Sequence, residues 1–212
     1  MARGWQSIRL EEIDPIPVVA GTLLWRPLRR MLDIGAFGMN AYTAPNAGDD
    51  VVEEHTEKML RHEEVYVVLS GRASFTLDEE ALDAPAGTVV FIRDPEVKRH
   101  ARAEEPETSV LAIGGARGAA YEPSAWEHAF FAEKYRAVGD YEAAAAEISR
   151  GLEQHPYDPA LLYDLGCAEA LAGRPQDALE HVRRALELKP EFLDHAQKDE
   201  DLVSLRELPG WP

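Results

Sequence analysis

The stretch HTEKMLRHEEVYVVLSG, residues 55–71, holds two histidines, then a pair of glutamates, and then an apolar run that ends at a glycine. An apolar run closed by a residue such as Gly71 is typical of a β-strand followed by a turn. Imidazole and carboxylate groups are common ligands of transition metals, so the polar start of the stretch is a candidate metal site. The stretch therefore predicts a strand with chemically active side chains near its beginning.

Two further stretches share this strand character. They are GTVVFIRD, residues 87–94, and TSVLAIGG, residues 108–115, and glycines and prolines separate such runs along the chain. Several short strands divided by turn residues are typical of a β-sandwich or a β-barrel. We therefore expect residues 1–120 to form a β domain with an N-terminal extension.

The pattern changes after Pro123, where Ala, Leu and Glu become frequent and the apolar spacing is helical. Ser124 followed by Glu127 predicts a capping box, in which each side chain binds a backbone amide at the start of the helix. We place the domain boundary near residue 120 and expect residues 121–212 to be helical.

The helical part repeats itself with a period of 34 residues. The matching pairs are Gly139 and Gly173, Ala144 and Ala178, Leu152 and Leu186, and Pro156 and Pro190. This period resembles the tetratricopeptide repeat (TPR), in which each repeat is a pair of antiparallel helices. Asp158 and Pro159 predict an N-cap and a first-turn proline for the second pair. The final stretch, residues 199–212, predicts a capping helix.

The β domain resembles the cupin superfamily over about residues 35–115. The resemblance is carried by HEEVYVVLSGRASFTLD, residues 62–78, and by APAGTVVFIRDPEVKRHARA, residues 84–103. It implies a small double-sheet jelly roll, also described as a β-barrel. It also implies a site in which three histidines and a glutamate hold a divalent metal inside the barrel.

The sequence departs from that pattern at two of the three histidine positions. His55 matches the first histidine, but Glu57 stands at the second and Arg99 at the third. His62 falls in what we expect to be an inserted loop. Successive side chains of a strand point to opposite faces, so Arg99 shares a face with two small alanines and faces inward, while His100 faces outward.

Two sets of candidate site residues follow. The first is a pocket without metal, in which Glu64, Tyr66 and Arg99 are ligand-binding side chains and the Arg99 guanidinium pairs with a carboxylate. The second is a site for Mn, Fe or Zn. Its ligands would come from His55, Glu57, His62 and Glu64.

The composition excludes several classes of protein. Lys and Arg number 22 against 39 Asp and Glu, giving a net charge of −17, which disfavours binding to nucleic acid or to an anionic membrane. Cys167 is the single cysteine, so we expect no internal disulfide and assign it a packing role. The N-terminal residues lack an apolar signal core, and no apolar run approaches the length of a membrane span. We expect a cytoplasmic protein.

Three hypotheses of function stay open. The first is a small-molecule-binding or sensory cupin with an altered, metal-poor barrel site. The second is a metal-dependent cupin enzyme of the dioxygenase or isomerase type. The third is an interaction protein that binds a partner through its helical repeats, although two and a fraction repeats fall short of the three or so that usually make a groove. We also expect a homodimer.

Overall fold

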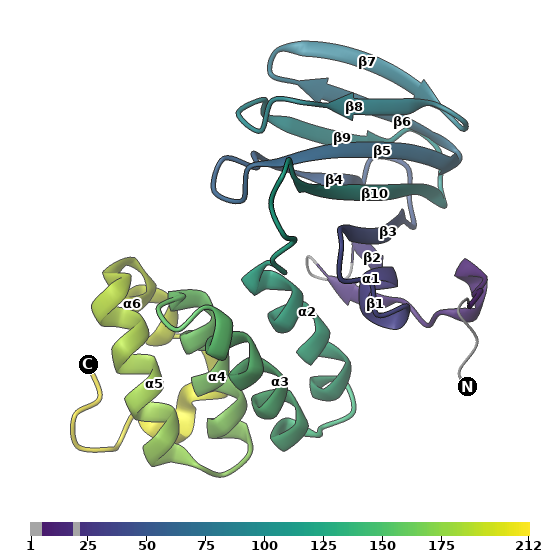
Figure 1. The fold of residues 1–212 in the computed structure, drawn as a ribbon. Coiled ribbons are helices and arrows are strands. Elements are labelled where there is room, and N and C mark those ends of the chain that lie inside the picture. Colours follow the sequence, from purple (N-terminus) through teal and green to yellow (C-terminus); the bar gives the residue numbers. More distant parts are fainter. Residues whose placement is uncertain (1–5, 19–21) are drawn as a thin grey trace, which may run out of the picture. The chain divides into compact units, whose positions relative to one another are not determined.

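The computed structural model describes residues 6–18 and 22–212. It divides into two compact units, Met1–Pro123 and Ser124–Pro212, which are described separately (Figure 1). The first five residues of the N-terminal stretch that lacks a signal core lie outside the described residues. None of the helices in the described ranges combines the length and the hydropathy that crossing a bilayer would need.

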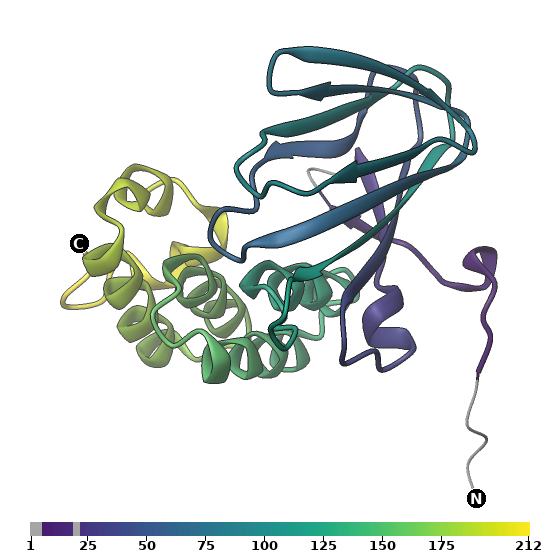
Figure 2. The same ribbon diagram turned by 45° about the horizontal axis from the view of Figure 1, so that its top comes forward.

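The first unit is built from two antiparallel sheets (Figures 1 and 2). The six-stranded sheet has the order β1-β2-β3-β10-β5-β8, and the four-stranded sheet has the order β4-β9-β6-β7. The strands are β1 Ile16–Val18, β2 Leu23–Arg26, β3 Gly38–Ala44, β4 Asp50–His55, β5 His62–Ser70, β6 Arg72–Leu77, β7 Glu80–Pro85, β8 Val89–Ile92, β9 Arg99–Ala103 and β10 Thr108–Ala116. Two short helices, η1 Leu10–Glu12 and α1 Leu28–Met31, accompany the first strands.

The core of this unit lies between the two sheets. Alternate residues of each strand point inward, so the core draws Tyr66 and Val68 from β5 of one sheet and Phe75 and Ala101 from β6 and β9 of the other. Gly71, which joins β5 to β6, has φ +72°, and a Cβ there would collide with Thr108. The glycine that closes the opening stretch is therefore required by the turn.

The opening stretch is not one continuous strand. β4 ends at His55 and β5 begins at His62, and residues 56–61 connect them through a turn in which Arg61 has φ +57°. The expectation that His62 lies within an inserted loop is therefore wrong, because the inserted residues stop just before it. As the first residue of β5, His62 is fixed by pairing with Ala116 of β10.

The outer edges of the two sheets differ. Strand β7, at the edge of the four-stranded sheet, has the sequence EALDAP, with acidic residues and a terminal proline. Strand β8, at the edge of the six-stranded sheet, exposes the apolar side chains of Val89 and Phe91. Charged residues and prolines protect a sheet edge from pairing with another chain. Val89 and Phe91 of β8 are neither charged nor proline.

The second unit consists of two helical hairpins and a C-terminal segment. The hairpins are α2 Ala125–Arg136 with α3 Tyr141–Gln154, and α4 Pro159–Leu171 with α5 Pro175–Leu188. The segment contains η3 Pro190–Phe192, α6 Leu193–Ala196 and η4 Glu200–Leu205. The predicted fold class, a β domain followed by a short array of helical hairpins, is confirmed.

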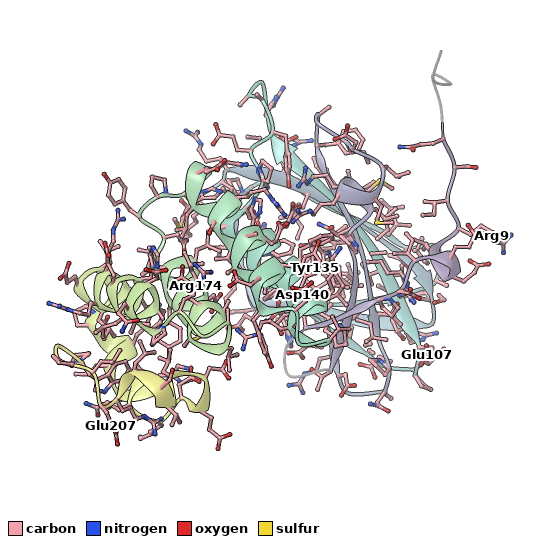
Figure 3. The ribbon with its side chains drawn as sticks, turned by 90° about the horizontal axis from the view of Figure 1, so that it is seen from below. Arg9, Glu107, Tyr135, Asp140, Arg174 and Glu207 are labelled. Carbon is pink, nitrogen blue, oxygen red and sulfur yellow. The ribbon has the colours of Figure 1, made fainter. Side chains whose placement is uncertain are left out.

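The repeat of 34 residues is visible in the backbone. Asp140 N donates to Tyr135 O in the first hairpin turn, and Arg174 N donates to Glu169 O in the second, both at 2.9 Å. Figure 3 labels three of these residues, Tyr135, Asp140 and Arg174, at the ends of their helices. Each turn is completed by a glycine with positive φ, so the matched glycines of the sequence have the same role in both repeats.

Close packing explains the small residues of the repeat. A Cβ on Gly166 of α4 would lie 2.5 Å from Val182 Cγ2 of α5, so only glycine fits where these helices meet. Ala144 and Ala178 are completely buried at matching positions. The spacing of small residues therefore sets how closely the helices of each hairpin approach.

The predicted helix ends have mixed outcomes. Asp158 caps α4 by accepting hydrogen bonds from the amides of Ala160 and Leu161, as expected. Ser124 is the N-cap of α2, but its hydroxyl makes no capping hydrogen bond, so the predicted capping box is wrong. In the stretch predicted to form a capping helix, residues 200–205 form a 3₁₀ helix.

Candidate functional site

A cluster of polar side chains lies at one end of the β unit, where three strands begin or end. His55 ends β4, Glu64 lies near the start of β5, and Arg99 begins β9. The register pairs His55 directly with Arg99, and Glu64 reaches them from the facing sheet. Residues that are distant in the sequence therefore meet because three strand ends coincide.

Arg99 faces the interior, as strand alternation predicts. Its side chain is 0% exposed, and Ala101 and Ala103 are buried on the same face of β9. His100 points to the other face, where its Nε2 lies 2.8 Å from Asp50 Oδ1. A cation therefore lies at the place where the cupin pattern has its third histidine.

Glu64 is the centre of the cluster. Its Oε2 accepts a hydrogen bond of 2.7 Å from the hydroxyl of Tyr66, and the same oxygen lies 3.5 Å from Arg99 Nε and 3.7 Å from His55 Nε2. Glu64 is mostly buried, so these contacts replace much of the water that would otherwise solvate its charge. The three predicted ligand-binding residues, Glu64, Tyr66 and Arg99, are thus brought together.

Glu57 joins the cluster from the loop between β4 and β5. Its Oε1 lies 3.7 Å from His55 Nε2, and its Oε2 lies 3.4 Å from His62 Nδ1. The carboxylate therefore stands between the two histidines. All four residues of the predicted metal set are near one another, but His62 reaches the set only through Glu57.

The protonation states follow from burial and charge. Burial raises the pKa of the Glu57 carboxyl to about 7, and the neighbouring charge of Glu64 adds to the rise. Burial acts on Glu64 in the same direction, but interactions with His55, Tyr66 and Arg99 outweigh it, so the pKa of Glu64 lies below its ordinary value. Burial lowers the pKa of His55, but its contacts with Glu64, Glu53 and Glu57 raise it by more. Near neutral pH, Glu64 is ionised, whereas the Glu57 carboxyl is close to the midpoint of its titration.

The cluster has some of the features of a metal site. Donor atoms of His55, Glu57 and Glu64 all lie within 4.8 Å of one another. His55 Nδ1 lies 2.7 Å from the carbonyl oxygen of Glu53, so Nδ1 carries a proton and Nε2 faces the carboxylates of Glu57 and Glu64. An imidazole that releases its Nε2 proton and two carboxylates are ligand types that suit a divalent ion.

Arg99 does not fit such an ion. Its guanidinium keeps its positive charge at any physiological pH and lies against Glu64, the ligand with the most stable negative charge. A divalent ion bound by Glu64 would be repelled by this buried cation. As it stands, the set of side chains does not fit a resident metal.

The guanidinium of Arg99 makes few hydrogen bonds. Within residues 6–18 and 22–212, Nε and Nη1 have no hydrogen-bond partner, and Nη2 donates one long hydrogen bond of 3.5 Å to the carbonyl oxygen of Asp94. Buried donors are nearly always satisfied, because each unmade hydrogen bond costs about 1–3 kcal/mol. The site therefore offers unused donor capacity beside an ionised carboxylate.

Tyr121 was not identified from the sequence. Its ring stacks on His62 with the ring centres 5.5 Å apart, and Arg29 lies 5.7 Å above the same ring. A Cβ on Gly38 would lie 2.7 Å from the Tyr121 hydroxyl, so the ring packs against strand β3 at a position where only glycine leaves enough room. No local pattern could reveal this contact, since His62 and Tyr121 are far apart in the chain.

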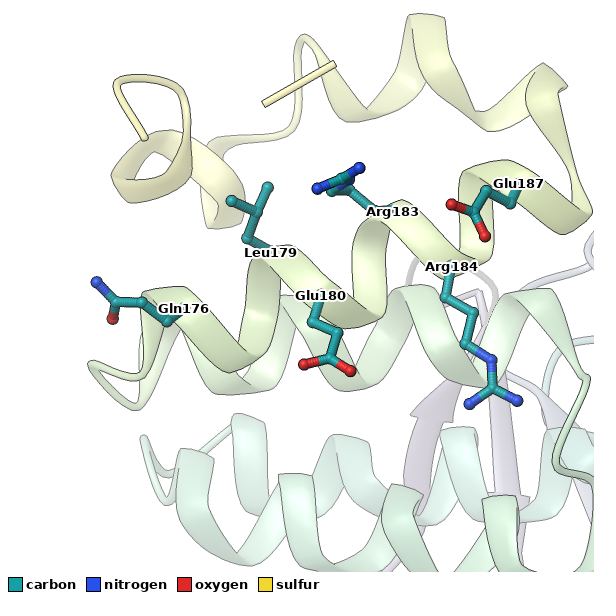
Figure 4. Close-up of a pocket in the computed structure, with 6 residues that line it drawn as sticks. All are labelled: Gln176, Leu179, Glu180, Arg183, Arg184 and Glu187. Carbon is teal, nitrogen blue, oxygen red and sulfur yellow. The ribbon is translucent and has the colours of Figure 1, made fainter. Parts of the chain in front are cut away.

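The helical unit has two further features. Cys167 is buried, and burial together with nearby carboxylates raises the pKa of its thiol, which agrees with the predicted packing role rather than with a nucleophile. A surface hollow of about 410 Å³ lies along α5 (Figure 4). It is lined by Gln176, Leu179, Glu180, Arg183, Arg184 and Glu187.

A protein-family model matches part of the helical unit. The tetratricopeptide repeat model matches residues 159–192, which are the second helical hairpin and the 3₁₀ turn after it. No curated protein sequence matches the chain.

The solved structures to which part of this chain is similar include proteins described as cupins. A cupin protein from Bacteroides fragilis is 22% identical, covers 57% of this chain and 92% of its own, and has a TM-score of 0.42. A predicted oxalate decarboxylase from Thermotoga maritima is 19% identical, with coverage of 52% and 99% and a TM-score of 0.44. A sugar phosphate isomerase of the cupin superfamily from Silicibacter pomeroyi is 14% identical, with coverage of 52% and 75% and a TM-score of 0.44.

Proposed function

We propose that the β unit binds a small polar molecule at the cluster formed by His55, Glu57, Glu64, Tyr66 and Arg99, without catalysing a reaction on it. Arg99 donates hydrogen bonds to the ligand, and Glu64 holds the guanidinium in place. In this proposal no resident metal is needed, and the chain acts as a binding or sensory protein.

The observation that carries the proposal is the buried, under-bonded guanidinium of Arg99. Two of its nitrogens have no hydrogen-bond partner in the part of the chain that the structure describes, although the side chain is 0% exposed. A ligand oxygen next to Nη1 would supply the missing acceptor. Arginine suits this role because its planar fork of donors matches carboxylates, phosphates and neighbouring hydroxyls.

The surroundings of Arg99 support binding more than chemistry. Tyr66 donates its proton to Glu64, and burial raises the pKa of the Tyr66 hydroxyl well above its ordinary value, so this phenol is a poor base. Glu64 is held ionised by three neighbours and is a poor general acid. Both groups are better suited to fixing a ligand than to transferring protons.

Native mass spectrometry of the purified chain tests the proposal. We expect the wild-type protein to carry a small-molecule adduct, or to acquire one from a panel of small acids, sugars and phosphates. Arg99→Met should lose the adduct, and Arg99→Lys should weaken it. The matched control is Arg102→Met, because Arg102 lies on the same strand but is exposed. A wild-type chain that binds no member of the panel would overturn the proposal.

A metal-dependent enzyme is the second candidate, favoured by the convergence of His55, Glu57 and Glu64 within 4.8 Å. Elemental analysis of protein purified without added metal separates the two candidates. One equivalent of Mn, Fe or Zn that is lost in His55→Ala would favour the enzyme. Less than one-tenth of an equivalent would favour the binding protein.

A further inference from the structure

A hollow of about 260 Å³ lies between the two helical hairpins, and we call it the inter-hairpin hollow. Its lining includes Ser149 and Leu152 of α3, Leu162 and Leu165 of α4, and His181 and Arg184 of α5. Leu165 belongs to the core shared by α2, α3 and α4, Leu162 belongs to the core of α4 and α5, and Leu152 packs against both. The hollow therefore has an apolar part where the two cores meet.

The two repeats differ at the polar positions of this hollow. The 34-residue period matches Arg150 with Arg184 and Glu147 with His181. In the first hairpin, Arg150 forms an ion pair with Glu147, which precedes it by three residues on α3. In the second hairpin, a histidine stands where that glutamate would be. Arg184 therefore lacks the carboxylate that its counterpart Arg150 has.

Arg184 is held in place by uncharged groups. Its Nη2 donates a hydrogen bond of 3.2 Å to the carbonyl oxygen of Pro156, and its guanidinium carbon lies 5.5 Å from the centre of the Tyr157 ring. Within the described part of the chain its contacts are thus with a carbonyl and an aromatic ring, not with a carboxylate. The planar guanidinium carries several further N–H donors, which suit a carboxylate.

His181 adds a second positive group to the hollow. Its Nδ1 lies 2.7 Å from Oε2 of the buried Glu169, whose Oε1 accepts a hydrogen bond of 3.1 Å from Arg174. The hydrogen bond with Glu169 raises the pKa of His181 above its ordinary value, burial opposes the rise, and the charges of Glu169 and Glu180 add to it. Among the lining groups, one carboxylate therefore faces two cations when His181 is protonated, and the hollow favours an anion.

We propose that the inter-hairpin hollow binds a small carboxylic acid with a short apolar chain. The carboxylate accepts hydrogen bonds from Arg184, His181 and the Ser149 hydroxyl, and the chain lies against the three leucines. The volume is below the roughly 300–1,000 Å³ of sites for drug-sized ligands, so the acid has few non-hydrogen atoms. The inference uses the helical unit alone and is independent of the function proposed for the β unit.

NMR titration of the full chain with sodium butyrate tests the proposal. The reporter is the ring signal of His181, which is assigned by its absence from the spectrum of His181→Gln. We expect butyrate to shift this signal saturably at millimolar concentration. Butanol keeps the chain but lacks the charge, and acetate keeps the charge but lacks most of the chain. Each should bind at least about fivefold more weakly than butyrate.

Substitutions identify the groups that hold the acid. Arg184→Gln should weaken butyrate binding at least about tenfold, because hydrogen bonds to a charged group are lost. Arg183→Gln is the matched control and should leave the affinity unchanged, because Arg183 and Arg184 point to opposite sides of α5 (Figure 4). Arg99→Met should also leave it unchanged, which separates this hollow from the site proposed in the β unit.

Several outcomes would overturn the proposal. They are a His181 signal that butyrate does not move, acetate or butanol binding as tightly as butyrate, and equal affinities of the wild type and Arg184→Gln. An affinity at His181 that falls in Arg99→Met would place the acid in the β unit and overturn it as well. Arg184 is exposed, and circular dichroism checks that its variant keeps its helices. If that variant does not fold, the comparison of the three probes on the wild type decides.

Discussion

Replacing Arg99 by histidine should convert the cluster of the β unit into a divalent-metal site. The change restores an imidazole at the position where the cupin pattern has its third histidine and removes a permanent charge. His55, Glu57 and Glu64 already have donor atoms within 4.8 Å of one another. The substitution therefore supplies a fourth ligand and frees Glu64 from its present partner.

The size of the effect follows from the distances. Arg99 Nε lies 3.5 Å from Glu64 Oε2, so an ion held by that oxygen would be close to the guanidinium. At 4 Å and an effective dielectric constant of about 20, two unit charges interact by about 4 kcal/mol, and a divalent ion by about twice that. Solvent and the nearby carboxylates reduce the net value. Even a quarter of it, about 2 kcal/mol, exceeds the 1.4 kcal/mol that corresponds to tenfold in Kd.

Isothermal titration calorimetry with Mn²⁺ and Zn²⁺ on metal-stripped protein measures the effect. We expect Arg99→His to bind one equivalent at least about tenfold more tightly than the wild type. Arg102→His, an exposed position on the same strand, should leave the affinity unchanged. Tight stoichiometric binding by the wild type, with no gain in Arg99→His, would falsify the idea that Arg99 excludes metal.

Three further predictions concern the pH dependence, the packing and the association of the chain. The pKa of Glu57 is about 7 in the folded chain against an ordinary 4.5, so folding favours its protonated form and stability should fall as pH rises through 7. Glu57→Gln should reduce this pH-dependent loss in the free energy of unfolding by about 1–2 kcal/mol, after allowance for solvent screening. Urea unfolding at pH 5 and pH 8 measures the loss in both proteins. An equal loss in the wild type and the variant would contradict the assignment. Gly166→Ala should lower the free energy of unfolding by about 1–3 kcal/mol, because its Cβ would lie 2.5 Å from Val182. The control Gly35→Ala should change it little, because no described atom lies within 4 Å of the added Cβ. Equal thermal midpoints for the two variants would refute the packing argument. Light scattering of the wild type should give twice the monomer mass of 23.6 kDa, and Phe91→Asp on the exposed edge strand should give the monomer; a monomeric wild type at micromolar concentration would rule out the dimer.

Periodic features of the chain were accessible from the sequence. Strand alternation placed Arg99 inside and His100 outside, because a strand offers only two faces. The 34-residue period located both helical hairpins, since matched glycines such as Gly139 and Gly173 adopt the same positive φ in equivalent turns. Both predictions depend on backbone geometry within one strand or one turn, which the residues of that segment determine themselves.

Features that depend on contacts between distant segments were not accessible. Tyr121 reaches His62 only because β10 leads the chain back beside β5, and no spacing records that approach. Ser124 and Glu127 have the residue types and spacing of a capping box, but both are buried and the Ser124 hydroxyl makes no capping hydrogen bond. Residues 200–205 form a 3₁₀ helix, in which Leu202 and Leu205, three residues apart, share a face and enter the core.

The difference between the two sheet edges has a consequence for how the chain behaves in solution. Strand β7 is guarded by acidic residues and proline, but β8 presents Val89 and Phe91 at an open edge. Long-range repulsion opposes the pairing of copies through this edge, because each chain has a net charge of −17. Such repulsion is screened beyond about 8 Å at physiological ionic strength and beyond about 3 Å in 1 M salt. The solubility of this protein should therefore depend on salt, and concentrated stocks should stay clear longest at low ionic strength.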